Sequence, residues 1–324
     1  MRDEIGEFCD DVSVTDPSSR DVLVIGESLV DLVMPENGAI EAVVGGGPLN
    51  TARALARLGG DVRLCSTVST DRFGNEIMSA LMADGVGTDL VERCVEPTTL
   101  AVAELSSVGS AEYRFYIDGT SAPMLTRSTL DTAPSWVFSG GLGLVLEPLA
   151  TRVTEIIESL PAATNVMLDV NARPRVIDNP DRHRILVERL VERCSVVKVS
   201  DEDLAHLYPD VGVDVAIDHL LQCGARLVVV TAGSAPVRAV GEAGAFSVQV
   251  PETRVVDSIG AGDTFDAGML SWWTSSDASD PLVPDQIVAA LNRGVAAAAV
   301  VVGRRGADPP ELADLAMGPR SVGD

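Results

Sequence analysis

Short apolar runs recur along the chain, and segments with helical spacing lie between them. Apolar residues three and four positions apart predict helices over 48–60 and 74–84. Strands that are buried on both faces read as nearly continuous apolar runs, because helices cover both sides of a parallel sheet. The alternation therefore restricts the chain to an α/β fold with a mostly parallel sheet flanked by helices. The predicted strands are Asp21–Gly26, Val62–Val68, Trp136–Phe138, Asn165–Val170, Ser195–Val199 and Arg226–Thr231.

Two segments interrupt this alternation. Residues 29–44 and 98–117 carry alternating apolar residues with no helical pattern. A period of two is typical of strands that expose one face. We therefore expect a few antiparallel strands that form a small sheet, inserted into the main domain and projecting from it as a lid. The domain is predicted to span 21–316, after an acidic, polar tail over 1–20 that we expect to be loosely ordered.

Composition excludes several classes of function. The 324-residue chain has a formal net charge of −24, which argues against nucleic acid and anionic membranes as partners. No apolar run approaches the roughly 18 residues of a membrane span, so we expect a cytoplasmic protein. The five cysteines form no C-x-x-C pair and the three histidines no H-E-x-x-H motif. The spacing thus predicts reduced thiols, and neither a disulfide framework nor a zinc site.

The turn Gly260-Ala261-Gly262, with Asp263 directly after it, is the most informative motif. Small residues let a ligand approach the backbone closely. A helix that begins near Gly262 would point its unpaired N–H groups at an anion such as phosphate. Asp263 would repel that anion, so its presence makes sense if it accepts a proton. The alternative is an ordinary turn in which Asp263 caps the helix.

A second glycine turn, Gly45-Gly46-Gly47, precedes the predicted helix that contains Asn50. Its exposed backbone can meet a polar ligand, and the Asn50 amide offers both a donor and an acceptor. Alone, this turn reads equally well as a flexible hinge. Its occurrence together with the turn at Gly260 favours a binding site.

The chain has a single lysine, Lys198, which lies in a strand-like run. A Walker A loop requires lysine followed by serine or threonine after a glycine-rich stretch, so this class of nucleotide-binding protein is excluded. A protein-kinase set of motifs is also missing. Phosphate chemistry in this chain would therefore depend on backbone amides, arginine and metal. A nicotinamide dehydrogenase is disfavoured because Gly26 begins no G-x-G-x-x-G motif.

Together the two glycine turns resemble the signatures of the PfkB (ribokinase-like) sugar kinase family. The resemblance extends from about Asp21 to Pro309. It implies a ribokinase-like three-layer fold with a small β-sheet lid, and an ATP-dependent sugar kinase. The motifs that carry it are Gly26–Asp31, Gly45–Gly59, Ser69–Gly74, Asp169–Arg173, Lys198–Asp203, Asp257–Leu270 and Arg305–Ala307.

The resemblance also implies residue roles. Asp263 would be the general base, and the backbone at Gly260, Ala261 and Gly262 would stabilise charge on the transferred phosphoryl group. The sugar would be bound by Asp31, at the end of the first strand, with Gly46, Gly47, Asn50, Asn171 and Arg173. The nucleotide would meet Lys198, Thr231, Gly233 and Gly262.

Two metal sites follow from the same resemblance. Mg²⁺ would arrive with ATP, and Asp203 would reach it through water. Asp257 resembles part of a monovalent-cation (K⁺) site, although a loop-capping role fits it equally well. Ser200, Asp203, Pro236 and Val295 depart from the family pattern on the nucleotide side.

The segments around Asp31, Ser69 and Tyr113 look most like the fructokinase branch. We therefore expect a neutral sugar, with fructose favoured. Asp118 stands where 2-keto-3-deoxygluconate kinases usually hold a sugar acid, and its charge would repel one. Such a kinase, a nucleoside kinase, or a sugar-binding regulatory protein on a kinase scaffold remain alternatives. An exposed lid edge invites pairing with a second chain, so we also expect a homodimer.

Overall fold

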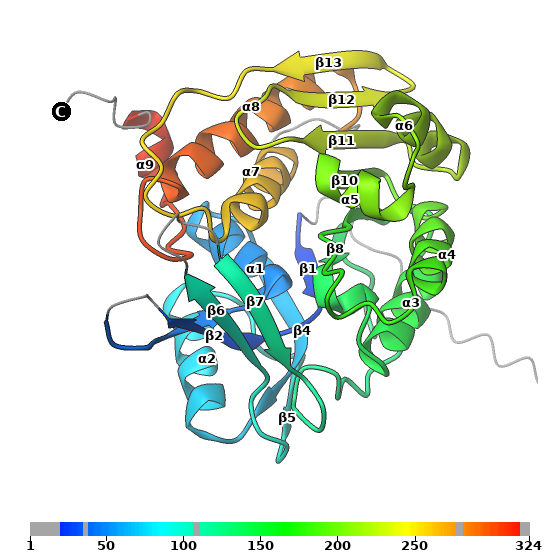
Figure 1. The fold of residues 1–324 in the computed structure, drawn as a ribbon. Coiled ribbons are helices and arrows are strands. Elements are labelled where there is room, and N and C mark those ends of the chain that lie inside the picture. The colour runs from blue at the N-terminus through cyan, green and yellow to red at the C-terminus, as the bar shows by residue number, and fades with distance from the viewer. Residues whose placement is uncertain (1–19, 35–37, 106–110, 276–280, 318–324) are drawn as a thin grey trace, which may run out of the picture.

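A nine-stranded main sheet forms the centre of the computed structural model, which describes residues 20–34, 38–105, 111–275 and 281–317 (Figure 1). The strand order is β13-β12-β11-β10-β9-β8-β1-β4-β5. The strands are β1 (Val22–Ile25), β4 (Val62–Ser69), β5 (Val91–Cys94), β8 (Trp136–Gly140), β9 (Asn165–Asp169), β10 (Val196–Ser200), β11 (Leu227–Thr231), β12 (Val237–Gly241) and β13 (Gly244–Val248).

The seven strands from β11 to β5 pair in parallel, which confirms the predicted architecture. All six predicted strands are present. At one edge, β12 and β13 pair antiparallel as a hairpin that returns from β11. That hairpin was not predicted.

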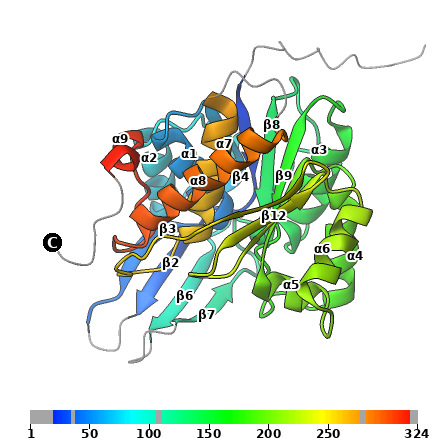
Figure 2. The ribbon, with the colours of Figure 1, turned by 90° about the horizontal axis from the view of Figure 1, so that it is seen from above.

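Helices cover both faces of the main sheet (Figure 2). Buried residues of α3 (Leu149–Ser159), α4 (Pro180–Val191), α5 (Asp201–Leu207) and α6 (Val213–Gln222) form one hydrophobic cluster with the strands. Those of α1 (Gly47–Arg57), α2 (Arg72–Ala83), α7 (Ala261–Ser275) and α8 (Pro284–Val301) form the other. A 3₁₀ turn (Gly141–Leu144) follows β8, and α9 (Leu312–Met317) follows α8.

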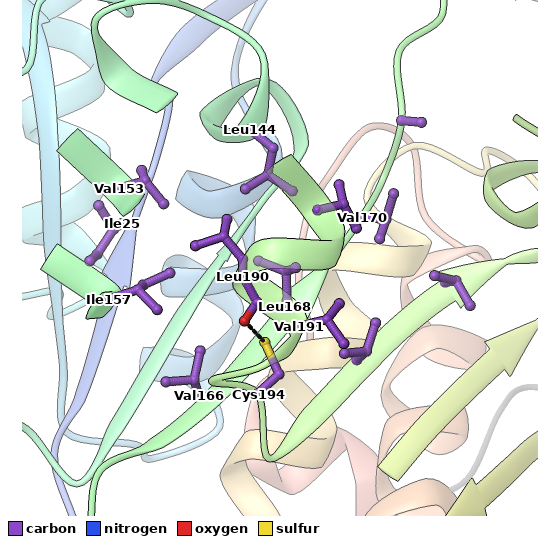
Figure 3. Packing of buried hydrophobic residues seen from close by; sticks show 14 of the residues in the cluster. Ile25, Leu144, Val153, Ile157, Val166, Leu168, Val170, Leu190, Val191 and Cys194 are labelled. Carbon is purple, nitrogen blue, oxygen red and sulfur yellow. Dashed lines mark hydrogen bonds between the residues drawn. The ribbon is translucent and has the colours of Figure 1, made fainter. Parts of the chain in front are cut away.

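Alternate residues of each strand enter opposite clusters, because successive side chains of a strand point to opposite faces. In β1, Leu23 and Ile25 pack toward α3 and α4, whereas Val22 and Val24 pack toward α1 and α7. Figure 3 shows Ile25 of β1 near Val153 and Ile157 of α3, within the first cluster. Both faces of the sheet are thus shielded from water, which explains the continuous apolar runs.

A separate four-stranded sheet has the order β3-β2-β6-β7. It consists of β2 (Leu29–Met34), β3 (Glu41–Gly45), β6 (Leu100–Leu105) and β7 (Ala111–Tyr116), within the two predicted segments. One expectation was wrong: the sheet is not wholly antiparallel, because β2 pairs with β6 in parallel. In Figure 2 its strands extend beyond the main sheet on one side.

The expected tail over 1–20 lies outside the described residues except for Arg20. Within the described ranges, no helix combines the length and the apolar character needed to cross a membrane.

Candidate active site

Two adjoining cavities lie beside the start of α7. One, of about 900 Å³, extends between the small sheet and the main sheet. The other, of about 840 Å³, lies between the β11–β12 side of the main sheet and α8. Both are lined by Ser258, Ala261 and Gly262. They flank the carboxyl ends of parallel strands, where open α/β sheets bind ligands.

The first cavity, which we call the cleft, contains most of the residues predicted to bind sugar or transfer phosphate. They come from β2, α1, the segment after β9 and the turn before α7, which are far apart in the sequence. The predicted residues that line it are Asp31, Gly46, Gly47, Asn50, Asn171, Arg173, Asp257, Gly260, Ala261, Gly262 and Asp263.

A hydrogen bond between Asn50 and Asp263 joins the two glycine turns. The Asn50 Nδ2 atom donates to Asp263 Oδ2 at 2.9 Å, and both side chains are buried. Asn50 Oδ1 is also buried and has no hydrogen-bond partner among the described residues. Because buried acceptors rarely stay unpaired, this oxygen is suited to accept a hydrogen bond from a ligand.

Glycine is required at both turns. Gly46 has a φ of 110°, and a Cβ there would lie 2.7 Å from the carbonyl oxygen of Glu27. A Cβ on Gly47 would lie 3.1 Å from Asn171 Nδ2 and 3.3 Å from Asp263 Oδ1. Helix α1 therefore begins against these polar groups with no side chain between them. In the other turn, Gly260-Ala261-Gly262, Gly260 has a φ of 76°.

Asp31 reaches the cleft from the small sheet. It lies within β2 and not at the end of β1, so the expected placement was wrong by one strand. A Cβ on Gly45 would collide with its carboxylate. Tyr113 and Phe115 of β7 also line the cleft, with ring centroids 6.2 Å apart. The small sheet thus supplies one wall of the cleft.

Glu27 is a cleft residue to which sequence reasoning assigned no role. Its Oε1 accepts the Gly47 N–H at 3.2 Å and its Oε2 accepts the Gly143 N–H at 3.0 Å. A Cβ on Gly141 would lie 3.0 Å from Oε1. The carboxylate therefore ties the end of β1 to two glycine turns. A clue in the sequence was an acid directly after the strand-ending Gly26.

Burial raises the pKa of three of the carboxyl groups that line the cleft, those of Glu27, Asp31 and Asp263. Desolvation raises the pKa of Asp263 to about 6, although Asn50 and Arg173 act to lower it. Desolvation and the charge of Asp263 raise the pKa of Asp31 to about 7. Desolvation raises the pKa of Glu27 to about 8. The Arg173 guanidinium opposes all three shifts and is the main cation facing these acids among the described cleft residues.

Lys198 lies beneath the cleft and lines neither cavity. Its Nζ is 3.0 Å from Asp169 Oδ1 and 3.1 Å from Oδ2, and only the second contact has hydrogen-bond geometry. Burial acts to lower the pKa of Lys198, but Asp169, Asp266 and Asp203 raise it. A Cβ on Gly262 would lie 3.3 Å from Nζ. Lys198 is therefore a buried cation whose ammonium group lies next to the first turn of α7.

Asp203 also faces inward. Its Oδ2 accepts the Ser200 N–H at 2.7 Å in a capping box, and its Oδ1 accepts the Ala172 N–H at 2.7 Å. Its neighbour Glu202 lines the cleft instead.

The Asp257 carboxylate accepts the N–H groups of Ile259 at 3.0 Å and Gly306 at 2.9 Å. It thereby joins the turn before α7 to the segment after α8.

The second cavity contains the predicted nucleotide residues Thr231, Gly233 and Gly262. Its other walls include Val250, Phe265, Val295 and Ala298, which are apolar. A slot with apolar walls and one glycine-rich end suits a flat ring system joined to an anionic group. The glycine-rich end includes Ala261 and Gly262, which also line the cleft.

Comparison with known proteins agrees with this geometry. Residues 19–314 match the pfkB family carbohydrate kinases. The chain is 33% identical over 261 residues to a fructokinase of Rhizobium leguminosarum bv. trifolii, covering 77% of this chain and 78% of that one. A fructokinase structure with bound ATP from Xylella fastidiosa has a TM-score of 0.84 and 27% identity, covering 92% of this chain and 98% of that chain.

An aminoimidazole riboside kinase structure from Salmonella enterica has a TM-score of 0.81 and 24% identity, covering 92% of this chain and 99% of that chain. At that identity it supports the fold alone. The fold and the cleft define an α/β phosphotransferase with a ribokinase-like architecture, as predicted. The chain belongs to the pfkB family, and it is an ATP-dependent carbohydrate kinase of fructokinase-like type.

The raised pKa of Asp263 predicts that this residue lowers the stability of the protein at neutral pH. Its pKa is about 6 in the folded state against an ordinary 3.8, so the folded state binds the proton more tightly. The contribution of Asp263 to the free energy of unfolding is therefore fully present below about pH 4 and is lost as the pH rises through about 6. Asp263→Asn should raise the free energy of unfolding at pH 8 by on the order of 1–3 kcal/mol.

Urea unfolding at pH 5 and pH 8 measures this difference, with a smaller gain expected at pH 5. Asp61→Asn, at an exposed turn, serves as the matched control and should change little. An Asp263→Asn variant that is less stable than the wild type at pH 8 would contradict the expectation.

Proposed function

We propose that the chain transfers the γ-phosphate of ATP to a primary hydroxyl of a neutral sugar, with fructose favoured. The position of Asp263 carries this proposal. Its carboxylate lines the cleft in the first turn of α7, directly after Ala261 and Gly262, which line both cavities, and its Oδ2 is held by Asn50. A sugar in the cleft and a nucleotide in the second cavity would present their reacting groups at this point.

Asp263 would act as general base. Its carboxylate takes the proton of the sugar hydroxyl while the hydroxyl oxygen bonds to the γ-phosphorus and the bond to the ADP oxygen breaks. The N–H groups of Gly262 and Asp263, in the first turn of α7, would stabilise charge on the transferred group. The Ala261 N–H contributes less, because it already donates to the Ser258 carbonyl at 3.2 Å.

The carboxylates of the cleft favour a neutral, hydroxyl-rich substrate. Asp31 and Asp263 are acceptors for hydroxyl groups, and Asn50 Oδ1 adds a further acceptor. Asn171 and Arg173, from the segment after β9, would donate hydrogen bonds. An anionic sugar acid would face several carboxylates in this space. Asp118 would not contribute to this repulsion. Contrary to our expectation, its side chain is exposed and lies outside the cleft.

Mg²⁺ would neutralise the phosphates of bound ATP and keep most of its water ligands. Both oxygens of Asp203 already accept backbone N–H groups, so Asp203 would contact a hydrated ion only through remaining lone pairs. Glu202 faces the cleft and fits that role better. Lys198 would act on the phosphates through charge alone, from beneath Gly262. The loop at Asp257 is the proposed place for K⁺ activation.

Asp263→Asn tests the proposed chemistry. We expect turnover to fall by at least about 10²–10⁴-fold, the usual contribution of a general base. Sugar binding should be retained, because the amide keeps an acceptor for Asn50. A coupled ADP assay measures the rate, and calorimetry with sugar and with a non-hydrolysable ATP analogue measures binding. Wild-type turnover in this variant would refute the mechanism, and failure of the wild type to bind nucleotide would favour a sugar-binding regulatory protein.

A panel of acceptors tests the substrate class. We expect kcat/KM to be highest for fructose and to be lower for 2-keto-3-deoxygluconate and for ribonucleosides. Release of ADP in the presence of each acceptor is the measurement. A ribonucleoside is the second candidate, because an aminoimidazole riboside kinase is among the relatives. A preference for the sugar acid would contradict the charge argument.

We also propose a homodimer that pairs through the small sheet. Its edge strands β3 and β7 offer unpaired backbone groups, and Tyr116 on β7 is 58% exposed. Sedimentation at micromolar concentration should show a dimer, and Tyr116→Lys should weaken it. A monomeric wild type would contradict this arrangement.

A further inference from the structure

Three potential metal ligands meet on the outer surface of the α4–α6 layer, away from both cavities described above. They are Glu188 of α4, His219 of α6 and Cys223, which ends α6. One ligand atom from each lies within 4.8 Å of the others. Among the described residues, no other group of three such side chains comes this close.

Two of the separations are close to those of a tetrahedral metal site. His219 Nε2 is 3.0 Å from Glu188 Oε1 and 3.6 Å from Cys223 Sγ. Ligands bound to Zn²⁺ at their usual distances and at tetrahedral angles lie roughly 3.3–3.7 Å apart. The same ring nitrogen thus faces both the carboxylate and the thiol. A small movement of Glu188 away from His219 would bring the shorter separation into this range. Three protein ligands would leave the fourth position of the metal to water.

The local sequence and packing hold this geometry. His219 and Cys223 are four residues apart, so they project from the same side of α6 one turn apart. The Tyr208 ring packs edge-on against His219 with centroids 5.1 Å apart, and its hydroxyl donates to Glu188 Oε1 at 3.3 Å. Glu188 contributes from a different helix, so a metal bound here would join α4 to α6.

The charges around these three residues also favour the binding of a cation. Glu188 and Glu192 both place negative charge near Cys223, which attracts a divalent ion. Arg184 competes for the site, because its Nη1 lies 3.4 Å from Glu188 Oε1. Arg184 also contacts Asp181, so it keeps a partner when a metal displaces it.

We propose that Glu188, His219 and Cys223 form a binding site for a borderline divalent transition metal, with Zn²⁺ as the preferred ion. Carboxylate, imidazole and thiolate are ligands that Zn²⁺ accepts, and the thiolate disfavours Mg²⁺ and Ca²⁺. The isolated spacing H-x-x-x-C gave no such indication, because the third ligand lies 31 residues away from His219 in sequence. The site is independent of the proposed sugar kinase activity.

Cobalt binding tests the proposal directly. The full chain, freed of metal with a chelator, is titrated with Co²⁺, whose thiolate charge-transfer absorption reports a Co–S bond. We expect one Co²⁺ per chain, displaced by Zn²⁺ and not by Mg²⁺. Cys223→Ser should abolish the charge-transfer band, and His219→Ala should weaken binding by more than the roughly 10–100-fold that loss of an outer-shell partner costs. Cys94→Ser, which removes another partly exposed thiol beside a glutamate, should leave the band unchanged.

Arg184→Gln is the opposite test, because removal of the competing cation should raise Zn²⁺ affinity. Zn²⁺ should also raise the thermal midpoint of the wild type and not of Cys223→Ser. Kinase activity should be unchanged in Cys223→Ser, since none of these residues lies in the cleft. Absence of the band in the wild type, or its persistence in Cys223→Ser, would overturn the proposal.

Discussion

The hydrogen bond from Asn50 to Asp263 connects two parts of the chain that are 213 residues apart, and the rest of the site is arranged around it. It holds the start of α1 against the start of α7, so both glycine turns open onto the same cleft. Helices α1 and α7 also pack on the same face of the main sheet. The core therefore fixes the positions of the helices, and this bond fixes the orientation of the carboxylate at their junction.

Concentrating acids at this junction has an energetic cost. Glu27, Asp31 and Asp263 all have raised pKa values because burial disfavours their charged forms. Asp266, one turn into α7, is fully buried and its pKa is raised by burial and by Asp169. Arg173 on one side and Lys198 beneath offset part of this cost. A substrate whose hydroxyl groups donate to the carboxylates would offset more, so ligand binding and stability are coupled at this site.

Much of the architecture could be predicted from the sequence because buried strands and amphipathic helices leave periodic patterns. Six of the nine strands of the main sheet, and the helix that starts at the Gly45-Gly46-Gly47 turn, followed from such patterns. The two glycine turns with Asn50 and Asp263 indicated a polar ligand site, and the resemblance to the pfkB family implied that Asp31 belongs to it.

The remaining features depend on contacts between distant segments. The parallel pairing of β2 with β6 places Asp31 opposite Ala101, and no local pattern encodes that register. Lys198 lies in a strand whose pattern gives no indication of which side its ammonium faces, and its burial against Asp169 was not predicted. Glu27 was missed because a single acid after a strand is ordinary until Gly47 and Gly143 donate to it. Asp118 was placed in the sugar site from sequence position alone, and the turn after β7 carries it elsewhere.

The pH dependence of kcat in the wild type and in Asn50→Ala tests the central claim most directly. The Nδ2–H group of Asn50 stabilises the ionised form of Asp263, so its removal should raise the pKa of the base. We predict a wild-type rate that rises with pH through about 6, the pKa of Asp263. In Asn50→Ala, the rise of kcat with pH should be shifted upward by about 1–2 pH units, the equivalent of one hydrogen bond to a charged group. The same pH dependence in both proteins would contradict the claim that this bond sets the proton affinity of Asp263, the proposed general base.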